Sequence, residues 1–382
     1  MSQVDTQLPP QRIRSPRPLI QSKVNLRHIF SIIEPNLAIC STNNYPQTII
    51  TNDQIAAEVI DGTIALVTLI SRTDRSPFFV SKKITTNYLL REHGPKILDS
   101  LAYVSPKIQS AIQHFPVHSF HPYVIVYLQA LADNQDTIDL MSHAQYPQSE
   151  QSIDFMAKRL NSLAYAIRDA ANSQLVRKEQ KNRKRAYQKN LNDLFRYLEW
   201  IASHAYPIKI YRLVLGYQLS GTWQKHPTPP VTAADAVRDR DTFIRNVRSD
   251  QILKQRIGYT WTLEYALERG FQIRFWCFFG EDTKTDKSLG KQLGDLWVKT
   301  TSAKGCYFLF DGIPSVTQDT PAFSVIHPGE HAKLKALKLF AKYNLVLPSL
   351  NQRLEKSNAG RTFGKGEQTK PRKFSKVPAN KS

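Results

Sequence analysis

The chain has 382 residues, of which 41% are hydrophobic and 22% are charged, so it can bury a large core, and its length favours two domains. It contains no run of about 18 consecutive apolar residues. Its N-terminus lacks the apolar segment of a secretory signal, so neither a membrane span nor a leader is expected. A total of 52 Lys and Arg against 32 Asp and Glu gives a net charge of +20. This excess favours a polyanionic partner over a generally basic protein that binds no nucleic acid.

The cysteines, Cys40, Cys277 and Cys306, are odd in number and far apart. They provide neither a disulfide framework nor a paired zinc motif. Cys277 and Cys306 lie in apolar runs, where we expect them to be small core residues. This cysteine usage favours a reducing, cytoplasmic location.

The first half of the chain is expected to be mainly helical. Residues 1–24 hold four basic residues among four prolines, which predicts a disordered basic arm. Residues 25–205 are expected to form a mainly helical N-terminal domain. Within it, residues 63–70 are an apolar run whose periodicity fits a strand or a helix equally well.

Residues 152–203 have the strongest helical pattern, because apolar residues repeat at helical spacing on both sides of a charged insert. The insert, residues 177–185, carries six positive charges and one negative charge. It is either a solvated helical segment or a hinge between two helices. We expect its basic side chains to contact DNA phosphates, with an exposed charged face as the alternative. They are Arg177, Lys178, Lys181, Arg183, Lys184 and Arg185.

The pattern changes after residue 207, and residues 206–350 are expected to form a second domain. Thr232 is a suitable N-cap for a helix to about residue 248, with Asp235 in its first turn. Another helix is expected at 288–301. Apolar runs predict strands at 208–217, 257–265, 271–279 and 306–310. The order β-α-β-β-α-β predicts an α+β fold with a ferredoxin-like antiparallel sheet and helices on one side.

The end of the chain is polar and basic. A last helix is expected at about 329–343. Residues 351–382 carry nine Lys or Arg against two Glu and are expected to be a basic, mostly disordered tail. Arg361 and Lys365, in its glycine-rich segment, are further candidates for phosphate contacts.

Four segments of the second half resemble a known family. They are 239–248 (DRDTFIRNVR), 258–265 (GYTWTLEY), 290–297 (GKQLGDLW) and 361–366 (RTFGKG). In this order they are similar to a helix, a Gly-Tyr-x-Trp-x-x-Glu-Tyr strand, a second helix and a terminal Arg-Thr-Phe-Gly-x-Gly. These elements belong to the inovirus-type (gene-II-product-like) replication proteins and the YagK/YfjJ C-terminal domain family. The resemblance runs from about residue 208 to residue 366, under half of the chain.

The resemblance implies an HUH-type fold, the fold of a class of single-strand endonucleases. In that class, two histidines separated by one residue on a central strand bind a divalent cation together with a polar residue of a neighbouring strand. The cation polarises the scissile phosphate, and a tyrosine attacks it. On this resemblance Gln272 and Arg274 occupy the histidine positions and Glu264 the third position. Glutamine is a poor ligand and a guanidinium repels a cation, so the metal site is expected to be degenerate.

The resemblance does not supply the tyrosine at its expected position either. The family's tyrosine falls at Leu339 or Phe340, and Tyr343 lies one turn further on, either as a displaced nucleophile or as a packing residue. His327 and His331 lie four residues apart, but the intervening Pro and Gly make a new metal site there the less favoured reading.

Other side chains of the predicted hairpin leave two interpretations open. Arg274 either holds a DNA phosphate or pairs with Glu264 across the hairpin. Tyr259, Trp261 and Tyr265 share one strand face, where they either stack on unpaired bases or pack under helices.

Three hypotheses follow. The favoured one is a DNA-binding, replication-initiator-like protein of a phage, prophage or plasmid, with no cofactor. Its expected partners are single-stranded or origin-hairpin DNA and host replication proteins, with no membrane. The second is an active nicking enzyme that uses Mg²⁺ or Mn²⁺ and Tyr343. The third is a non-catalytic regulatory or structural protein of a mobile element.

Overall fold

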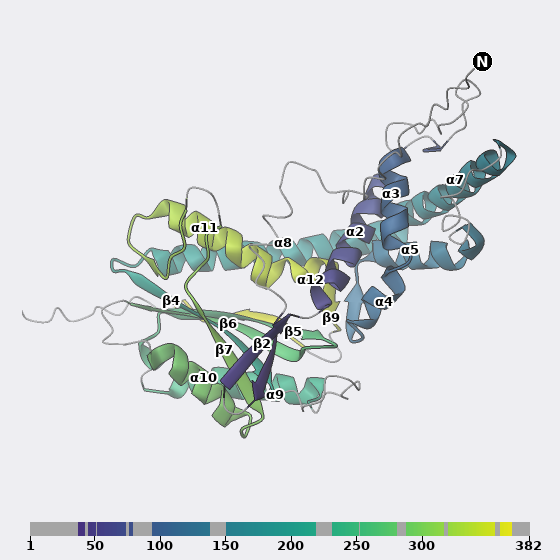
Figure 1. The fold of residues 1–382 in the computed structure, drawn as a ribbon. Helices are drawn as coiled ribbons and strands as arrows, with labels where there is room; N and C mark the ends of the chain where they lie inside the picture. The colour runs from purple at the N-terminus through teal and green to yellow at the C-terminus, as the bar shows by residue number, and fades with distance from the viewer. Residues whose placement is uncertain are drawn as a thin grey trace, which may run out of the picture.

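The computed structural model describes residues 37–42, 45–50, 52–73, 76–78, 94–137, 150–218, 231–251, 253–280, 288–316, 320–355 and 360–368. The predicted basic arm, residues 1–24, lies outside these ranges. The described chain is an α+β protein in which one group of helices packs together and other helices pack on an antiparallel sheet (Figure 1).

The helices of the first half share one hydrophobic core. They are α2 (Asp53–Ser71), α3 (Gly94–Val104), α4 (Ile108–Gln113), α5 (Pro122–Ala132) and α7 (Glu150–Asn172). Residues 63–70, which fit a strand or a helix by sequence, lie in α2, where Leu66, Val67 and Ile70 are buried. By length and composition alone, α2 is the one helix among the described residues that could cross a membrane. Apolar side chains of α2 are part of the hydrophobic core that these helices share.

The predicted helix over 152–203 is two helices, α7 and α8 (Gln174–Ala202), separated at Ser173. The Ser173 hydroxyl accepts a hydrogen bond from the Val176 N–H and so caps α8. The basic insert lies inside α8, so it is a helical segment and not a hinge. Leu194 and Leu198, further along α8, belong to a core shared with the sheet residue Trp276. Thus α8 extends from the helical part onto the sheet (Figure 1).

The main sheet contains the four predicted strands, each within one residue of its expected ends: β4 (Ile208–Tyr217), β5 (Gly258–Ala266), β6 (Gly270–Gly280) and β7 (Gly305–Asp311). They lie in the order β5-β6-β4-β7, and each neighbouring pair is antiparallel. The connection from β4 to β5 contains α9 (Ala233–Ser249) and the short helix η1 (Leu253–Gln255), and α10 (Ser288–Thr300) connects β6 to β7. The short strand β8 (Val325–Ile326) pairs with the start of β4.

A capping box fixes the start of α9. The Asp235 N–H donates to the Thr232 hydroxyl at 3.2 Å, and the Thr232 N–H donates to the Asp235 carboxylate at 3.2 Å. This confirms Thr232 as the predicted N-cap. The helix then buries Phe243 edge-on against Phe275 of β6.

Helices cover both faces of the sheet, and not one face as predicted (Figure 1). Successive strand residues point to opposite faces. Tyr259, Trp261 and Tyr265 are buried in the core that includes α9 and α10, as the packing interpretation of this stripe predicts. The opposite face is covered by α8, by α11 (His331–Ala341) and by the π-helix η2 (Lys342–Val346). It carries the polar residues Thr262, Glu264, Gln272 and Arg274.

Short strands tie distant segments together, and none of them was predicted. After α12 (Pro348–Asn351), β9 (Gln352–Leu354) pairs with β3 (His118–Phe120). The segment β10 (Phe363–Lys365) pairs with β5 and forms the edge of the sheet. The expectation of a mostly disordered tail from residue 351 is therefore wrong for these two segments. A further hairpin joins β1 (Leu37–Thr42) to β2 (Tyr45–Ile50).

Glycine is required in the edge strand β10. Gly364 lies directly against Trp261 of β5, and a Cβ atom at this position would overlap the indole ring. The Arg-Thr-Phe-Gly-x-Gly segment that carries part of the family resemblance is thus a sheet edge held closely against its neighbour.

Candidate functional site

The candidate site lies on the sheet face opposite α9 and α10. In the register of β5 with β6, Glu264 is opposite Gln272 and Thr262 is opposite Arg274. The pairing therefore brings together the three positions that sequence analysis assigned to a degenerate metal site, Glu264, Gln272 and Arg274.

Arg274 is engaged by Glu264. Its Nε lies 3.2 Å from Oε1 and 3.0 Å from Oε2 of the carboxylate, and the two side chains are 6% and 16% exposed. Of the two interpretations of Arg274, the ion pair across the hairpin is the one that the structure contains. A guanidinium fixed in this way neutralises the carboxylate that a cation would need.

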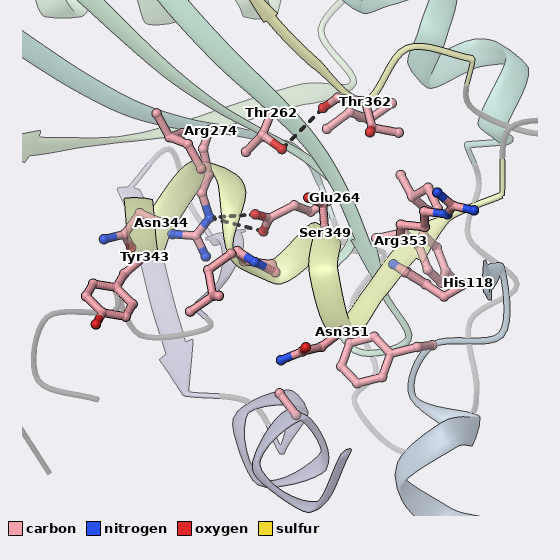
Figure 2. Close-up of a pocket in the computed structure, with 18 of the residues that line it drawn as sticks. His118, Thr262, Glu264, Arg274, Tyr343, Asn344, Ser349, Asn351, Arg353 and Thr362 are labelled. Carbon is pink, nitrogen blue, oxygen red and sulfur yellow. Dashed lines mark hydrogen bonds and ion pairs between the residues drawn. The ribbon is translucent and has the colours of Figure 1, made fainter. Parts of the chain in front are cut away.

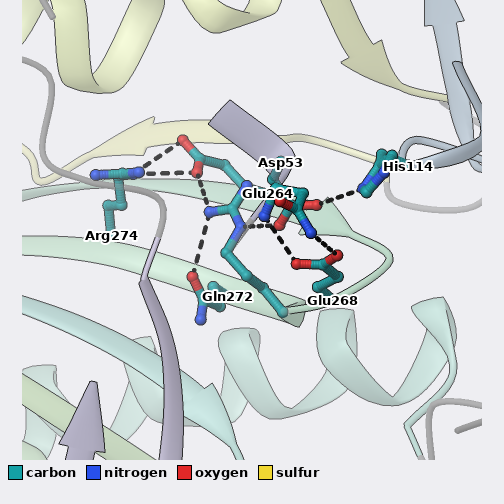
Figure 3. A network of polar contacts seen from close by, with 8 residues as sticks. Asp53, His114, Glu264, Glu268, Gln272 and Arg274 are labelled. Atoms are coloured by element: carbon teal, nitrogen blue, oxygen red, sulfur yellow. Dashed lines mark hydrogen bonds and ion pairs between the residues drawn. The ribbon is translucent and has the colours of Figure 1, made fainter. Parts of the chain in front are cut away.

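The ion pair is part of a longer network (Figure 3). Arg269, in the β5–β6 turn, places Nη1 3.7 Å from the Glu264 carboxylate and 3.4 Å from Gln272 Oε1. Its Nε donates to Asp53 at 2.8 Å, and the other Asp53 oxygen lies 3.1 Å from His114 Nδ1. This hydrogen bond to Asp53 raises the pKa of His114. Sequence analysis missed Arg269, Asp53 and His114, because nothing local indicates that they meet.

A second contact joins the same two parts of the fold. The Asn52 N–H and side-chain amide donate to Glu268 at 2.9 and 3.1 Å (Figure 3). The β5–β6 hairpin is therefore bonded to the start of α2 through the Arg269–Asp53 ion pair and the Asn52–Glu268 hydrogen bonds. We call the linked residues Asp53, His114, Glu264, Arg269, Gln272 and Arg274 the ionic network.

The ionic network does not fit a metal ion. Its one carboxylate on the sheet, Glu264, is bound by two guanidinium groups, and Gln272 accepts a hydrogen bond from Arg269. Across the described ranges, no group of three His, Cys, Asp or Glu side chains is placed to hold a metal. His327 and His331 are exposed in and after the turn before α11, where the His327 N–H donates to Glu330.

A cavity of about 120 Å³ adjoins the Arg274–Glu264 pair (Figure 2). Its walls come from α2, from β5, from the segment η2–α12 and from β9. Tyr343 lines it, so the structure places the candidate nucleophile at the same cavity as Glu264 and Arg274.

Tyr343 is not arranged as a nucleophile. Figure 2 shows its hydroxyl directed away from the Arg274–Glu264 pair. Burial raises the pKa of the phenol, which lowers the fraction of phenolate at neutral pH. The Lys342 ammonium lies 5.2 Å from the centre of the ring. These contacts fit the packing interpretation of this residue.

The exposed face of α8 carries the largest share of the predicted phosphate contacts. Arg177, Lys178, Lys181, Lys184 and Arg185 are exposed there. The same face continues with Lys189 and Arg196, which sequence analysis did not include. Asp193 pairs with Arg196. We call Lys181, Lys184, Arg185, Lys189 and Arg196 the α8 basic row.

Arg183 does not belong to this surface, which corrects its assignment as a phosphate contact. Its side chain is 4% exposed and lies 3.3 Å from Glu179 Oε1. It also donates to the Ser119 hydroxyl at 3.1 Å. Arg183 thus anchors α8 to the strand β3, because the helical repeat turns it away from its basic neighbours.

The two basic candidates near the end of the chain flank β10. Arg361 is exposed, and its Nε donates to the Phe363 carbonyl at 2.7 Å. Lys365 lies with its ammonium 4.9 Å from the Tyr197 ring. Arg361 therefore contacts the backbone of β10, and Lys365 contacts an aromatic ring of α8. Neither residue is part of the α8 basic row.

No family model, curated protein or solved structure matches the chain in the comparisons.

Proposed function

We propose that the protein binds DNA as a replication-initiator-like protein of a phage, prophage or plasmid, and that an ionic network stands where relatives of the HUH type hold a metal. The order β4-α9-β5-β6-α10-β7, with strands side by side as β5-β6-β4-β7, supports a ferredoxin-like sheet of the HUH kind. The four segments of the family resemblance fall on α9, β5, α10 and β10 of this unit.

The observation that carries DNA binding is the α8 basic row. Its five cations stand on one exposed helix face with a single acidic residue, Asp193, among them. Like charges gathered in this way repel each other, and a phosphate backbone relieves the repulsion while releasing its own counterions. The net charge of +20 extends the same attraction to longer range.

The test is the salt dependence of binding to a single-stranded and a hairpin oligonucleotide. The logarithm of the affinity should fall linearly with the logarithm of the salt concentration, by about 0.7 per neutralised phosphate on a single strand. Lys181→Gln/Lys184→Gln/Lys189→Gln should lower this slope by about 2, since three contacts are lost.

A matched variant controls for charge alone. Arg245→Gln/Lys291→Gln/Lys299→Gln removes three exposed cations from α9 and α10, on the other side of the sheet. It should leave the slope close to that of the unchanged protein. Binding that does not respond to salt, or equal losses in the two triple variants, would reject the α8 basic row as the DNA-binding surface.

One observation favours a second candidate, a tyrosine-dependent nicking enzyme: Tyr343 lines the same cavity as Glu264 and Arg274. The orientation of its hydroxyl and the ion-paired state of Glu264 weigh against it. Incubation with supercoiled DNA and Mg²⁺ or Mn²⁺ separates the two candidates. We expect no nicked product, and a covalent protein–DNA adduct that is lost in Tyr343→Phe would establish the enzyme instead.

A further inference from the structure

The cavity beside the ionic network has no role in the DNA contacts proposed above. It lies where three separate cores of the fold meet. Phe115 belongs to the helical core, Tyr265 and Leu354 to the core under α9 and α10, and Leu345 to the core under α8. All four residues line the cavity. Junctions between packed units are places where ligand sites commonly form.

The size of the cavity limits what it can hold. Its volume of about 120 Å³ is somewhat below the ~150 Å³ at which an apolar cavity in another protein accepts a benzene ring. The space therefore holds at most a single six-membered ring. A fused two-ring system such as a purine, or a complete nucleotide, is too large to enter without movement of the walls.

The walls combine apolar side chains with one polar end. Phe115, Leu345 and Leu354 offer apolar surface, which suits a flat ring better than a sugar with many hydroxyl groups. At the polar end, the Asn351 amide donates to one oxygen of Asp61 at 2.6 Å. Among the described residues, no donor is recorded for the second carboxylate oxygen of Asp61 or for the amide oxygen of Asn351. Two acceptors thus stand side by side at this end of the cavity and can accept hydrogen bonds from N–H donors.

The charges of the walls agree with an uncharged ring that is joined to an anion. Arg269, Arg274 and Arg353 line the cavity against the carboxylates of Asp61 and Glu264. Burial, with Arg269 nearby, lowers the pKa of His118 to about 4, so its ring is neutral at pH 7. Arg353 is the most accessible of the arginines, with a third of its side chain exposed.

The backbone at the rim is unusual. Tyr343, Asn344 and Leu345 stand in the five-residue π-helix η2, a rare geometry that is frequent at functional sites. The wider turn of a π-helix shifts the side chains that follow it, and here it brings Leu345 to the cavity between α11 and α12.

We infer that this cavity binds a single pyrimidine ring, with the ring between the apolar walls and its donor group, the ring N–H of thymine or the amino group of cytosine, directed at Asp61 and Asn351. The same chemistry is offered by a free pyrimidine nucleoside and by an unpaired nucleotide of DNA. For the unpaired nucleotide of DNA, the inference rests on the proposed function. It adds a preference for pyrimidine bases to a protein whose α8 basic row contacts only phosphates.

The experiment measures two kinds of binding to the full-length protein. In the first, thymidine and cytidine are titrated and followed by NMR or calorimetry, with adenosine as the size control. In the second, short oligonucleotides of dT, dC or dA are compared with one that lacks bases, at a fixed salt concentration. We expect both pyrimidine nucleosides to bind more tightly than adenosine, and the pyrimidine oligonucleotides to bind more tightly than the others.

Two variants locate the effect. Ala57→Leu adds bulk to the α2 wall of the cavity and should weaken pyrimidine binding by about tenfold or more. Asp61→Asn keeps the shape of the polar end and removes the carboxylate, and it should weaken binding in the same direction. Circular dichroism and the melting temperature check that both variants fold.

The outcomes separate this inference from the proposed function. Salt-dependent DNA binding with no base preference, unchanged by Ala57→Leu in a folded protein, would overturn the pyrimidine cavity and leave the α8 basic row intact. Pyrimidine nucleoside binding that Ala57→Leu weakens, in a protein with no affinity for DNA, would support the cavity and refute the proposed function.

Discussion

At the scale of the residue, the sheet face toward α8 is governed by buried charge. Arg269 and Asp53 are 5% and 0% exposed, and Arg274 and Glu264 are 6% and 16% exposed. Removing one partner of a buried pair leaves an uncompensated charge, which costs more than the pair itself contributes. The ionic network therefore stabilises the fold only as a complete set, and single replacements within it should be more harmful than paired ones.

Arg274→Met should lower the free energy of unfolding by about 3 kcal/mol, because Glu264 loses the guanidinium that neutralises it. Adding Glu264→Gln should recover part of this loss. Urea denaturation of the single and double variants measures both effects. Arg196→Gln is the control, since its pair with Asp193 is largely exposed and should contribute less than about 1 kcal/mol. An Arg274→Met variant as stable as the original chain would contradict the assigned role of the network.

Asp61 gives a prediction with a definite dependence on pH. Burial raises its pKa from 3.8 to about 6, so the folded chain retains this proton where the unfolded chain has released it. Stability from this group is therefore lost as the pH rises from about 4 to about 6, and the loss is complete above that range. Asp61→Asn should raise the melting temperature at pH 8 by more than at pH 5. Equal shifts at the two pH values would show that the carboxyl group titrates normally.

At the scale of the element, α8 shows how a helix divides a basic run between two roles. Neighbouring residues are about 100° apart around a helix axis, so a run of six cations cannot face one side. Arg183 turns inward to Glu179 and Ser119, while Lys184 and Arg185 stay in the solvent. The charge of the insert is visible in the sequence, but its division is decided by which face of α8 meets β3.

Arg183→Gln and Lys184→Gln should therefore affect different properties, the first stability and the second DNA affinity. The first should destabilise the fold by about 1–3 kcal/mol through the loss of buried hydrogen bonds, and leave DNA affinity nearly unchanged. The second should leave the melting temperature within about a degree and weaken DNA binding. Thermal melts and oligonucleotide titrations of the two variants provide the comparison. Equal effects on DNA affinity would restore Arg183 to the binding surface.

Some elements have a local signal in the sequence, and others depend on contacts with distant segments, so only the first kind could be predicted. The strands β4 to β7 and the helix α9 were predicted because each has a local signal, either an apolar run or a capping residue such as Thr232. The strands β3, β9 and β10 are three residues long and gain their hydrogen bonds from distant segments. In the same way Arg269 bonds to Asp53 across 216 positions of the chain. That Glu264, Gln272 and Arg274 meet across the β5–β6 hairpin was predictable, but the distant partners that bind them were not.

At the scale of the whole molecule, β9 and β10 join residues 352–365 to both the helical part and the sheet. The strand β9 binds β3 of the helical part, and β10 covers the edge of β5. An uncovered sheet edge presents unpaired N–H and C=O groups to other chains. We therefore expect the stability of the sheet, and the resistance of the protein to self-association, to depend on residues that were predicted to form a tail.

Two truncated chains test this dependence. A chain that ends after Gln368 keeps β9 and β10 and should melt within a few degrees of the full chain. A chain that ends after Leu350 lacks both strands, and it should melt at a lower temperature and associate. Calorimetry and light scattering report the two properties. A monomeric, equally stable chain ending after Leu350 would show that the two strands contribute nothing to the sheet.

The position of β9 and β10 late in the sequence also affects when, during synthesis, the protein becomes able to distinguish bases. A chain is synthesised from its N-terminus, and its parts fold as they emerge. The helix α8 is complete well before residue 354, whereas the cavity needs walls from α2, β5, η2 and β9 together. Under the two proposals, a nascent chain already attracts nucleic acid but has no means of distinguishing bases. Discrimination is then a property acquired only after β9 has been synthesised, and products that stop before β9 would compete for DNA without selecting a site.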